Sequence, residues 1–265
     1  MSDTPLGRFC WYELMTTDPE AAKGFYGKVV GWSTETGEAG GQPYTMWKSG
    51  EQPIGGVMEL PAEAAASGAP PHWIAYVSTP DCEATVAKVE KLGGSTTWGP
   101  MHVPTVGRFA GLADPQGAMF AVLESDEEAP MPGTDDAPPV GMFSWNELAT
   151  SDWKSAWTFY RGVFDWSDAG DFDMGDMGLY QMFGNRTNVP DGAESVGGMF
   201  DKPAEMPVAA WLHYIRVADL DAAVEAVTAN GGIVANGPME VPGGDRVAQC
   251  IDPQGVMFAL HATAD

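Results

Sequence analysis

The sequence predicts an α+β fold in which four βαβββ units form two tandem copies of one domain. Two observations predict it. The first half of the chain is repeated in the second half, and within each half a strand, a helix and further strands follow one another twice. A chain of 265 residues is long enough for two ordinary domains, and a hydrophobic content of 44% is sufficient for a buried core in each.

The repeat is clearest where each half begins. Residues 9–35 (FCWYELMTTDPEAAKGFYGKVVGWSTE) align without a gap with residues 143–169 (FSWNELATSDWKSAWTFYRGVFDWSDA). Residues 73–124 align in the same way with residues 211–262, and each contains the sequence Asp-Pro-Gln-Gly. We therefore expect domains at residues 5–125 and 141–263, joined by an acidic, Pro-containing linker at 126–140.

Each βαβββ unit is expected to begin with an alternating strand, for example residues 9–16 and 73–79. A helix follows, because apolar residues recur at helical spacing and an Asp stands at each expected N-cap. The helices are expected to end near Gly31 or at Gly93-Gly94, and short strands separated by Gly and Pro complete each unit. The expected N-cap residues are Asp18, Asp81, Asp152 and Asp219.

Composition restricts the partners and the compartment. The formal net charge of −24 leaves no basic surface for nucleic acid or for anionic membranes. No run of 18 apolar residues and no secretory signal are found, and the three Cys are widely spaced, so a reducing cytoplasm is expected. A small-molecule ligand is the expected partner, and the chain is expected to be a monomer or a homodimer.

These motifs resemble those of the vicinal-oxygen-chelate superfamily (glyoxalases, bleomycin-resistance proteins and dioxygenases). The resemblance is carried by the Phe-Tyr pair of the first helix, the Gly-Gly after the second helix and the Asp-Pro-Gln-Gly turn in both halves, and by Gly31-Trp32 in the first half. Tandem two-domain actinobacterial members, described as glyoxalase-like or as hydroxylases, are the most similar. The resemblance implies a sheet curled around one ligand cleft per domain, in which many members hold a divalent metal.

The resemblance also implies four metal-ligand positions per domain, and most of them carry residues that bind no metal. They are Trp11, Glu59, Ile74 and Ala121 in the first domain, and Trp145, Asp201, Leu212 and Ala259 in the second. Each domain keeps at most one carboxylate, whereas a stable site needs three or four ligands. We therefore expect no metal and no other cofactor, with Glu59 and Asp201 as weak candidate ligands.

Two alternatives to this register stay open. A shift of one residue in the second-unit strand would place Trp73 and Trp211 in the cleft, and a shift of two would involve His72 or His213. His261 with Glu147 is the other alternative, a fragment of an acid–base or nonstandard metal site, although a His near a chain end is commonly only solvated.

Strand alternation predicts which side chains line the clefts. Glu13 and Glu147 are the candidate catalytic residues, because an acidic group on an apolar face raises its pKa or finds a partner. The alternatives are a salt bridge to Arg108 or Arg246, or a solvated carboxylate. The candidate ligand-binding residues are Trp11, Met15, Tyr76, Met119, Trp145, Tyr214, Arg216, Met257 and His261.

The expected function is binding of a small, aromatic organic molecule in a metal-free cleft, with metal-independent lyase-like or hydroxylase-like chemistry as one outcome. One alternative is non-catalytic sequestration of a drug or metabolite, as in bleomycin-resistance proteins, which the acidic charge and the Trp-rich cleft favour. The other is a metal-dependent glyoxalase-type lyase or dioxygenase. The sequence does not decide whether both clefts are functional.

Overall fold

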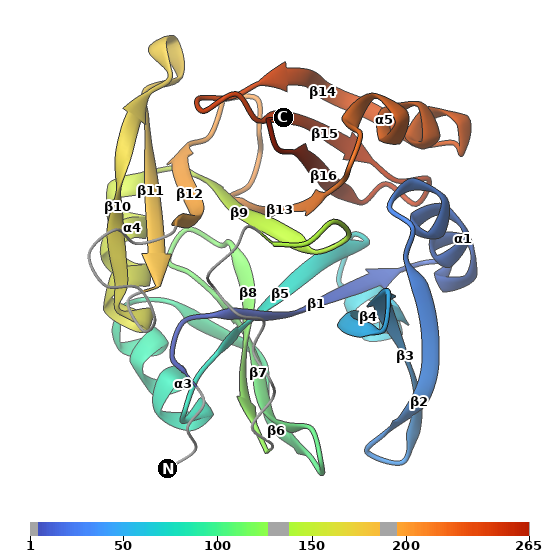
Figure 1. Ribbon diagram of the computed structural model, residues 1–265. Coiled ribbons are helices and arrows are strands. Elements are labelled where there is room, and N and C mark those ends of the chain that lie inside the picture. Colours follow the sequence, from blue (N-terminus) through green and yellow to red (C-terminus); the bar gives the residue numbers. More distant parts are fainter. Residues whose placement is uncertain (1–4, 127–137, 186–194, 265) are drawn as a thin grey trace. The chain divides into compact units, whose positions relative to one another are not determined.

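A computed structural model describes residues 5–126, 138–185 and 195–264, and these form two eight-stranded sheets with five helices (Figure 1). Most of the expected linker lies outside the described residues. In the first half the strands are β1 (Phe9–Thr16), β2 (Ser33–Ala39), β3 (Gln42–Ser49), β4 (Gln52–Glu59), β5 (His72–Ser78), β6 (Ser95–Val103), β7 (Gly107–Ala113) and β8 (Met119–Ser125), and the helices are α1 (Pro19–Val29), α2 (Ala62–Ala66) and α3 (Cys82–Lys91).

The second half repeats this order. Its strands are β9 (Phe143–Thr150), β10 (Trp166–Asp173), β11 (Leu179–Asn185), β12 (Ser195–Asp201), β13 (Ala210–Arg216), β14 (Ile233–Glu240), β15 (Arg246–Ile251) and β16 (Met257–Ala262), and its helices are α4 (Trp153–Phe164) and α5 (Leu220–Ala229). The predicted order of strand, helix and three strands is confirmed in all four units.

The strand order is the same in both sheets. In the first sheet β2-β3-β4-β1 form one half and β5-β8-β7-β6 the other, and in the second sheet β10-β11-β12-β9 and β13-β16-β15-β14 take the same places. In each half-sheet the first strand pairs in parallel with the last strand of its own unit, for example β1 with β4 and β13 with β16. The predicted α+β class is therefore confirmed, with each unit contributing one half-sheet and its covering helix.

The four predicted helix N-caps are confirmed. The side chain of Asp18 accepts a hydrogen bond from the backbone N–H of Ala21 at 3.0 Å, and Asp81 accepts one from Ala84 at 2.8 Å. The equivalent caps in the second half are Asp152 and Asp219. Each cap satisfies a backbone N–H that lacks a partner within its helix, which sets the start of the helix directly after the first strand.

From here on we call each βαβββ unit a module. The chain divides into two larger compact units, and each compact unit combines one module of the first half with one module of the second half. One contains residues 5–10, 75–126, 145–185 and 195–211, and the other contains residues 11–74, 138–144 and 212–264. In the second of these, α1 packs against α5, which lie side by side in Figure 1. In the first, α3 packs against α4. The Gly-Gly after the second helix serves this packing, because a Cβ at Gly94 would lie 2.7 Å from the Val89 side chain and 3.2 Å from the Phe159 ring.

A buried hydrogen-bonded chain lies at the centre of each unit. In one, the indole N–H of Trp73 donates to the hydroxyl of Tyr26 at 3.0 Å, and this hydroxyl donates to Asp252 Oδ2 at 3.2 Å. The other unit has the same arrangement of Trp211, Tyr160 and Asp114. The Phe-Tyr pair and the Asp-Pro-Gln-Gly turn recognised in the sequence therefore meet through one buried hydroxyl.

Replacing Tyr26 with Phe is expected to lower the free energy of unfolding by about 2 kcal/mol, because it leaves a buried indole N–H and a buried carboxylate oxygen without this partner. Urea unfolding followed by tryptophan fluorescence measures the change. Tyr160→Phe is the matched variant in the other unit and is expected to cost a similar amount. Unchanged unfolding midpoints in both variants would contradict this role.

Candidate functional site

Trp11 and Glu13 lie on β1 and meet a tyrosine from β3. The indole N–H of Trp11 donates to the hydroxyl of Tyr44 at 3.0 Å. This hydroxyl donates in turn to Glu13 Oε2 at 2.7 Å. We refer to Trp11, Glu13, Tyr44 and Gly56 as the Glu13 cluster.

Gly56 makes the Glu13 cluster possible. It lies on β4 directly opposite Glu13 in the parallel register with β1. A Cβ at this position would overlap with the Tyr44 hydroxyl and would lie 2.5 Å from Glu13 Oε1. Only a residue without a side chain therefore lets the tyrosine ring lie across the strand and reach the carboxyl group.

Burial makes the Glu13 carboxyl group a weaker acid than an ordinary glutamic acid side chain. Its residue is 4% exposed, and burial raises its pKa from 4.5 to about 7, although the hydrogen bonds of Tyr44 and Trp11 act in the opposite direction. Among the described residues, Oε1 has no hydrogen-bond partner. The group can therefore give up or accept a proton near neutral pH, and one of its oxygens has an unused capacity for a hydrogen bond.

The same arrangement recurs on β9 in the second half. The indole N–H of Trp145 donates to the Tyr180 hydroxyl at 2.7 Å, and this hydroxyl donates to Glu147 Oε2 at 3.1 Å. Gly198 lies opposite Glu147, and a Cβ there would overlap with the Tyr180 ring. We call these four residues the Glu147 cluster.

The surroundings of the Glu147 cluster are strongly aromatic. The Tyr180 ring stacks on Phe172 at 4.9 Å and on Phe200 at 5.8 Å between centroids. Glu147 itself is half-buried, so it is more exposed than Glu13. Apolar residues that pack in the same cluster are Ala149, Met174, Met182 and Met206.

Tyr44, Tyr180 and the two glycines were not among the predicted site residues. The signal is nevertheless present in the repeat. Residues 44–47 (YTMW) correspond to residues 180–183 (YQMF), and residues 55–58 (GGVM) correspond to residues 197–200 (GGMF). A tyrosine on the third strand of each half, followed by a Gly-Gly pair on the fourth strand, is the sequence pattern that corresponds to this geometry.

The other predicted ligand-binding residues of the first half have apolar or aromatic side chains. The ring of Tyr76 lies 6.4 Å from Trp98 and 6.3 Å from Phe109 between centroids. Met119 is 39% exposed, and Met15 is half-buried. These aromatic rings belong to the second module of the first half, where Tyr76 and Met119 were predicted ligand-binding residues and Trp98 and Phe109 were not.

The corresponding set in the second half includes polar and charged side chains. The Tyr214 hydroxyl accepts a hydrogen bond from the Gln249 amide at 3.2 Å, and Arg216 lies beside His261 in the register of β13 and β16. Met257 is 44% exposed. His261 is not merely solvated, because both of its ring nitrogens have hydrogen-bond partners. The two halves therefore present different chemistry at matching positions.

The donor set does not fit the metal that many members of the resembled superfamily hold. Glu59 is paired with Thr16, so strand alternation directs it away from the face that carries Glu13 and Met15. Asp201 Oδ1 accepts the backbone N–H of Trp153 at 2.8 Å, which places it at the start of α4. Within residues 5–126, 138–185 and 195–264, no three His, Cys, Asp or Glu side chains are grouped in a way that could hold a metal.

The structure does not have the shifted register that would place Trp73 and Trp211 in a cleft. Within its described residues it also does not have a salt bridge from Arg108 or Arg246 to the two candidate catalytic glutamates. Trp73 and Trp211 point into the cores, where each donates to a buried tyrosine. Arg108 pairs with Glu83 at 3.0 Å and Arg246 pairs with Asp221 at 2.9 Å, both on the neighbouring helices. His213 is buried, and burial lowers its pKa to about 3, so it is a neutral core residue.

Four βαβββ modules with the same strand order in both sheets define the class of fold to which this chain belongs. The chain belongs to the Glyoxalase/Bleomycin resistance protein/Dioxygenase superfamily, whose family model matches residues 8–122 and 143–260.

Relatives in actinobacteria are similar to this chain. The anthracycline biosynthesis protein DauV of Streptomyces sp. (strain C5) is 30% identical over 266 residues, which cover 96% of this chain and 92% of that protein. The glyoxylase-like protein CFP32 of Mycobacterium bovis is 44% identical over 119 residues, which cover 44% of this chain. That match spans less than half of the length of CFP32, also 44%.

Solved structures share the fold at low sequence identity. The Mn(II)-bound glyoxalase of Novosphingobium aromaticivorans superposes with a TM-score of 0.64 at 16% identity, covering 99% of this chain and 84% of that chain. The 2,3-dioxygenase LapB of Pseudomonas sp. KL28 superposes with a TM-score of 0.65 at 13% identity, covering 100% and 94%. In the described part of the chain, no helix combines the length and apolar character needed to span a membrane.

Proposed function

We propose that this protein binds a small, planar aromatic molecule against Trp11 and Trp145 and exchanges a proton with it through Glu13, without a metal ion. The observation that carries the proposal is the Glu13 carboxyl group. It is buried, it is held by Tyr44, and its Oε1 has no hydrogen-bond partner among the described residues. A buried carboxyl group that titrates near neutral pH suits a general base acting on an acidic hydroxyl or C–H group.

Aromatic side chains support the choice of ligand class. Phe172, Tyr180 and Phe200, which lie in the same compact unit as Trp145, supply ring faces and edges that favour stacking on a planar ligand. DauV and the Streptomyces peucetius protein DnrV are named for anthracycline biosynthesis. Anthracyclines contain fused aromatic rings, so a ligand of this shape agrees with both observations.

The donor set supports the absence of a metal from the proposed mechanism. Trp11 and Trp145 stand at the first of the family's ligand positions, and each is held by its own tyrosine hydroxyl. The role of Glu13 in the proposal is general acid–base catalysis, that of Tyr44 is to position the carboxyl group, and that of Trp11 is to contact the ligand.

Anthrone, a three-ring ketone with an acidic methylene group, is a suitable probe. The protein is first treated with a chelator and its metal content is measured. We expect saturable binding by tryptophan fluorescence and, by NMR in deuterium oxide, faster exchange of the methylene hydrogens than in buffer. Glu13→Gln is expected to keep binding and to lose the acceleration, by about 100-fold.

The outcomes separate the alternatives. Exchange that appears only after a divalent metal is added would contradict the metal-free mechanism. Binding without any acceleration of exchange would support sequestration instead of catalysis. Failure to bind anthrone up to its solubility limit would contradict a planar aromatic ligand.

Trp11→Leu and Trp145→Leu are each expected to weaken anthrone binding at their own half about tenfold, because stacking on an aromatic ring contributes on the order of 1 kcal/mol beyond area burial. Calorimetry measures the affinities. Trp157→Leu is the control, since Trp157 packs on the outer side of the core from α4. An equal loss in the control would indicate a general effect on folding.

A further inference from the structure

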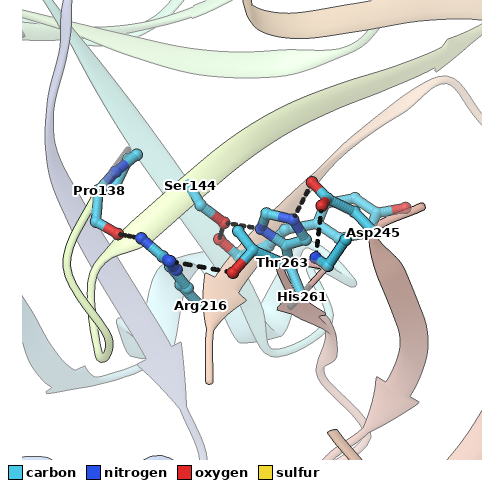
Figure 2. Close-up of polar contacts among 8 residues, drawn as sticks. Pro138, Ser144, Arg216, Asp245, His261 and Thr263 are labelled. Atoms are coloured by element: carbon cyan, nitrogen blue, oxygen red, sulfur yellow. Dashed lines mark hydrogen bonds and ion pairs between the residues drawn. The ribbon is translucent and has the colours of Figure 1, made fainter. Parts of the chain in front are cut away.

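A second set of chemically competent side chains occurs only in the second half of the chain. Figure 2 shows Ser144, His261 and Asp245 in line, joined by hydrogen bonds. Ser144 Oγ lies 2.9 Å from His261 Nδ1, and Asp245 Oδ2 lies 2.9 Å from His261 Nε2. These three residues, which we call the Ser144 relay, belong to one compact unit.

The fold does not require the Ser144 relay. In the aligned first half the three positions are occupied by Cys10, Leu123 and Gly107, which cannot form such a chain. The sulfhydryl of Cys10 and the hydroxyl of Ser144 otherwise occupy matching places, each 3.4 Å from the backbone carbonyl of the equivalent tyrosine. At these three aligned positions the second half therefore has hydrogen-bonded polar side chains, whereas the first half has a Cys, a Leu and a Gly.

Hydrogen bonding fixes the direction in which a proton can move. Burial opposes ionisation of Asp245, but hydrogen bonds from the Ala264 N–H and from His261 hold the pKa of this carboxyl group below its ordinary value. A carboxylate only accepts, so the proton on a neutral His261 lies on Nε2 and Nδ1 is the acceptor. The hydroxyl of Ser144, at 2.9 Å, then donates to Nδ1.

The three residues are positioned on rigid elements and are accessible. Ser144 lies at the start of β9 and His261 lies on β16, while Asp245 directly precedes β15. Ser144 is half-buried, the His261 side chain is 16% exposed and that of Asp245 is 37% exposed. All three residues are therefore partly exposed to solvent.

A cation lies on the same sheet face. Arg216 is paired with His261 in the strand register, and its guanidinium donates to the carbonyl of Pro138 at 2.6 Å and to the hydroxyl of Thr263 at 3.0 Å (Figure 2). These two bonds hold its positive charge beside the relay. Such a charge favours an oxyanion that forms nearby.

We propose that Ser144 is a nucleophile toward small carboxylic esters, with His261 as its general base and Asp245 as the residue that orients the imidazole. The arrangement matches the roles of a Ser-His-Asp triad, with the two ring nitrogens exchanged. Either nitrogen can accept the hydroxyl proton when the other donates to the carboxylate. This activity is separate from the acid–base role proposed for Glu13.

The reaction consists of two balanced steps. Ser144 Oγ forms a bond to the acyl carbon and transfers its proton to His261 Nδ1, and the bond from the acyl carbon to the alcohol oxygen breaks as the alcohol takes that proton. Water then forms a bond to the acyl carbon and gives a proton to Nδ1, the bond from the acyl carbon to Ser144 Oγ breaks as Oγ takes that proton, and the carboxylic acid is released. No electron donor or acceptor is needed.

A biotinylated alkyl fluorophosphonate tests the proposal directly, because it phosphonylates only activated serines with loss of fluoride. We expect one labelled peptide, containing Ser144, and slow hydrolysis of p-nitrophenyl acetate. Ser144→Ala is expected to abolish the label, and His261→Gln and Asp245→Asn are each expected to slow labelling about 100-fold. Ser67→Ala is the control, because Ser67 is exposed in the same unit and bonds only to its own helix.

A second variant covers the case in which Ser144→Ala affects folding. Ser144→Cys reproduces the residue that the first half carries at this place, and it is expected to gain a site of rapid iodoacetamide alkylation that His261→Gln removes. Cys10 is the internal control, since burial raises its pKa to about 12. Absence of fluorophosphonate labelling in the folded wild-type protein, or equal labelling of wild type and His261→Gln, would overturn the proposal.

Discussion

Replacing Glu13 with Gln is expected to stabilise the protein increasingly, relative to the wild type, as the pH rises to neutral and above. The pKa of this carboxyl group is raised by burial from 4.5 to about 7 in the folded protein. Between these two values the folded protein keeps a proton that the unfolded chain has lost. The free energy of unfolding of the wild type therefore falls as the pH rises, and the contribution of Glu13 is fully lost above about pH 7.

The expected magnitude is about 3 kcal/mol, because each pH unit between the two pKa values corresponds to about 1.4 kcal/mol. Glutamine does not ionise, so the difference in stability between variant and wild type is expected to shift by this amount in favour of the variant between about pH 4 and about pH 8.5. Urea unfolding at a series of pH values gives this difference. The comparison does not depend on the absolute cost of burying the amide, which is the same at every pH.

Glu59→Gln is the control for loss of one negative charge. Glu59 is exposed on the adjacent strand β4, and its substitution is expected to leave the shape of the stability curve unchanged. Parallel curves for Glu13→Gln and wild type would mean that the Glu13 carboxyl group titrates normally, and the acid–base role would then lose its basis. The same variants, assayed for anthrone exchange, link the stability measurement to the proposed chemistry.

The fold was predictable because its determinants are local and occur four times. Alternation along residues 9–16, the Asp at each helix N-cap and the Gly that follows α1, α3 and α5 are short-range signals, and the repeat removed most of the ambiguity about their order. The pairing of modules from different halves into one compact unit was not predicted. It depends on Tyr26 reaching Asp252, a contact between residues 226 positions apart that no local pattern encodes.

The candidate site was predictable only on the strand that carries it. Alternation along β1 placed Trp11 and Glu13 on one face, but Tyr44 comes from β3, and its approach depends on the register of β3, β4 and β1. The only specific partners that the sequence suggested for Glu13, as an alternative to a raised pKa, were the cations Arg108 and Arg246. The sequence instead supplies a tyrosine hydroxyl and a glycine to make room for it, a solution visible only once the strands are aligned.

The two neighbouring glycines of β4 are expected to respond very differently to substitution by Ala. A Cβ at Gly55 would overlap with the backbone carbonyl oxygen of Tyr12, which is fixed in the paired strand β1. The strands must separate to accommodate it, so Gly55→Ala is expected to cost about 3 kcal/mol or more of unfolding free energy. A Cβ at Gly56 meets the far ends of the Tyr44 and Glu13 side chains instead, which can move.

Gly56→Ala is therefore expected to cost only about 1 kcal/mol of stability, because the Tyr44 ring swings away, while it removes the hydrogen bond to Glu13. The loss of that bond raises the pKa of Glu13 further, since Tyr44 acts to lower it. The measured pH of half-maximal anthrone exchange is then expected to move upward in Gly56→Ala. Tyr44→Phe removes the same bond without the added methyl group, and it is expected to move the pH of half-maximal exchange in the same direction.

Two outcomes would contradict this role of Tyr44. One is an equal loss of stability in Gly56→Ala and Gly55→Ala. The other is a wild-type pH dependence of exchange in both Gly56→Ala and Tyr44→Phe. Either would mean that Tyr44 does not hold the carboxyl group in solution as it does in this structure.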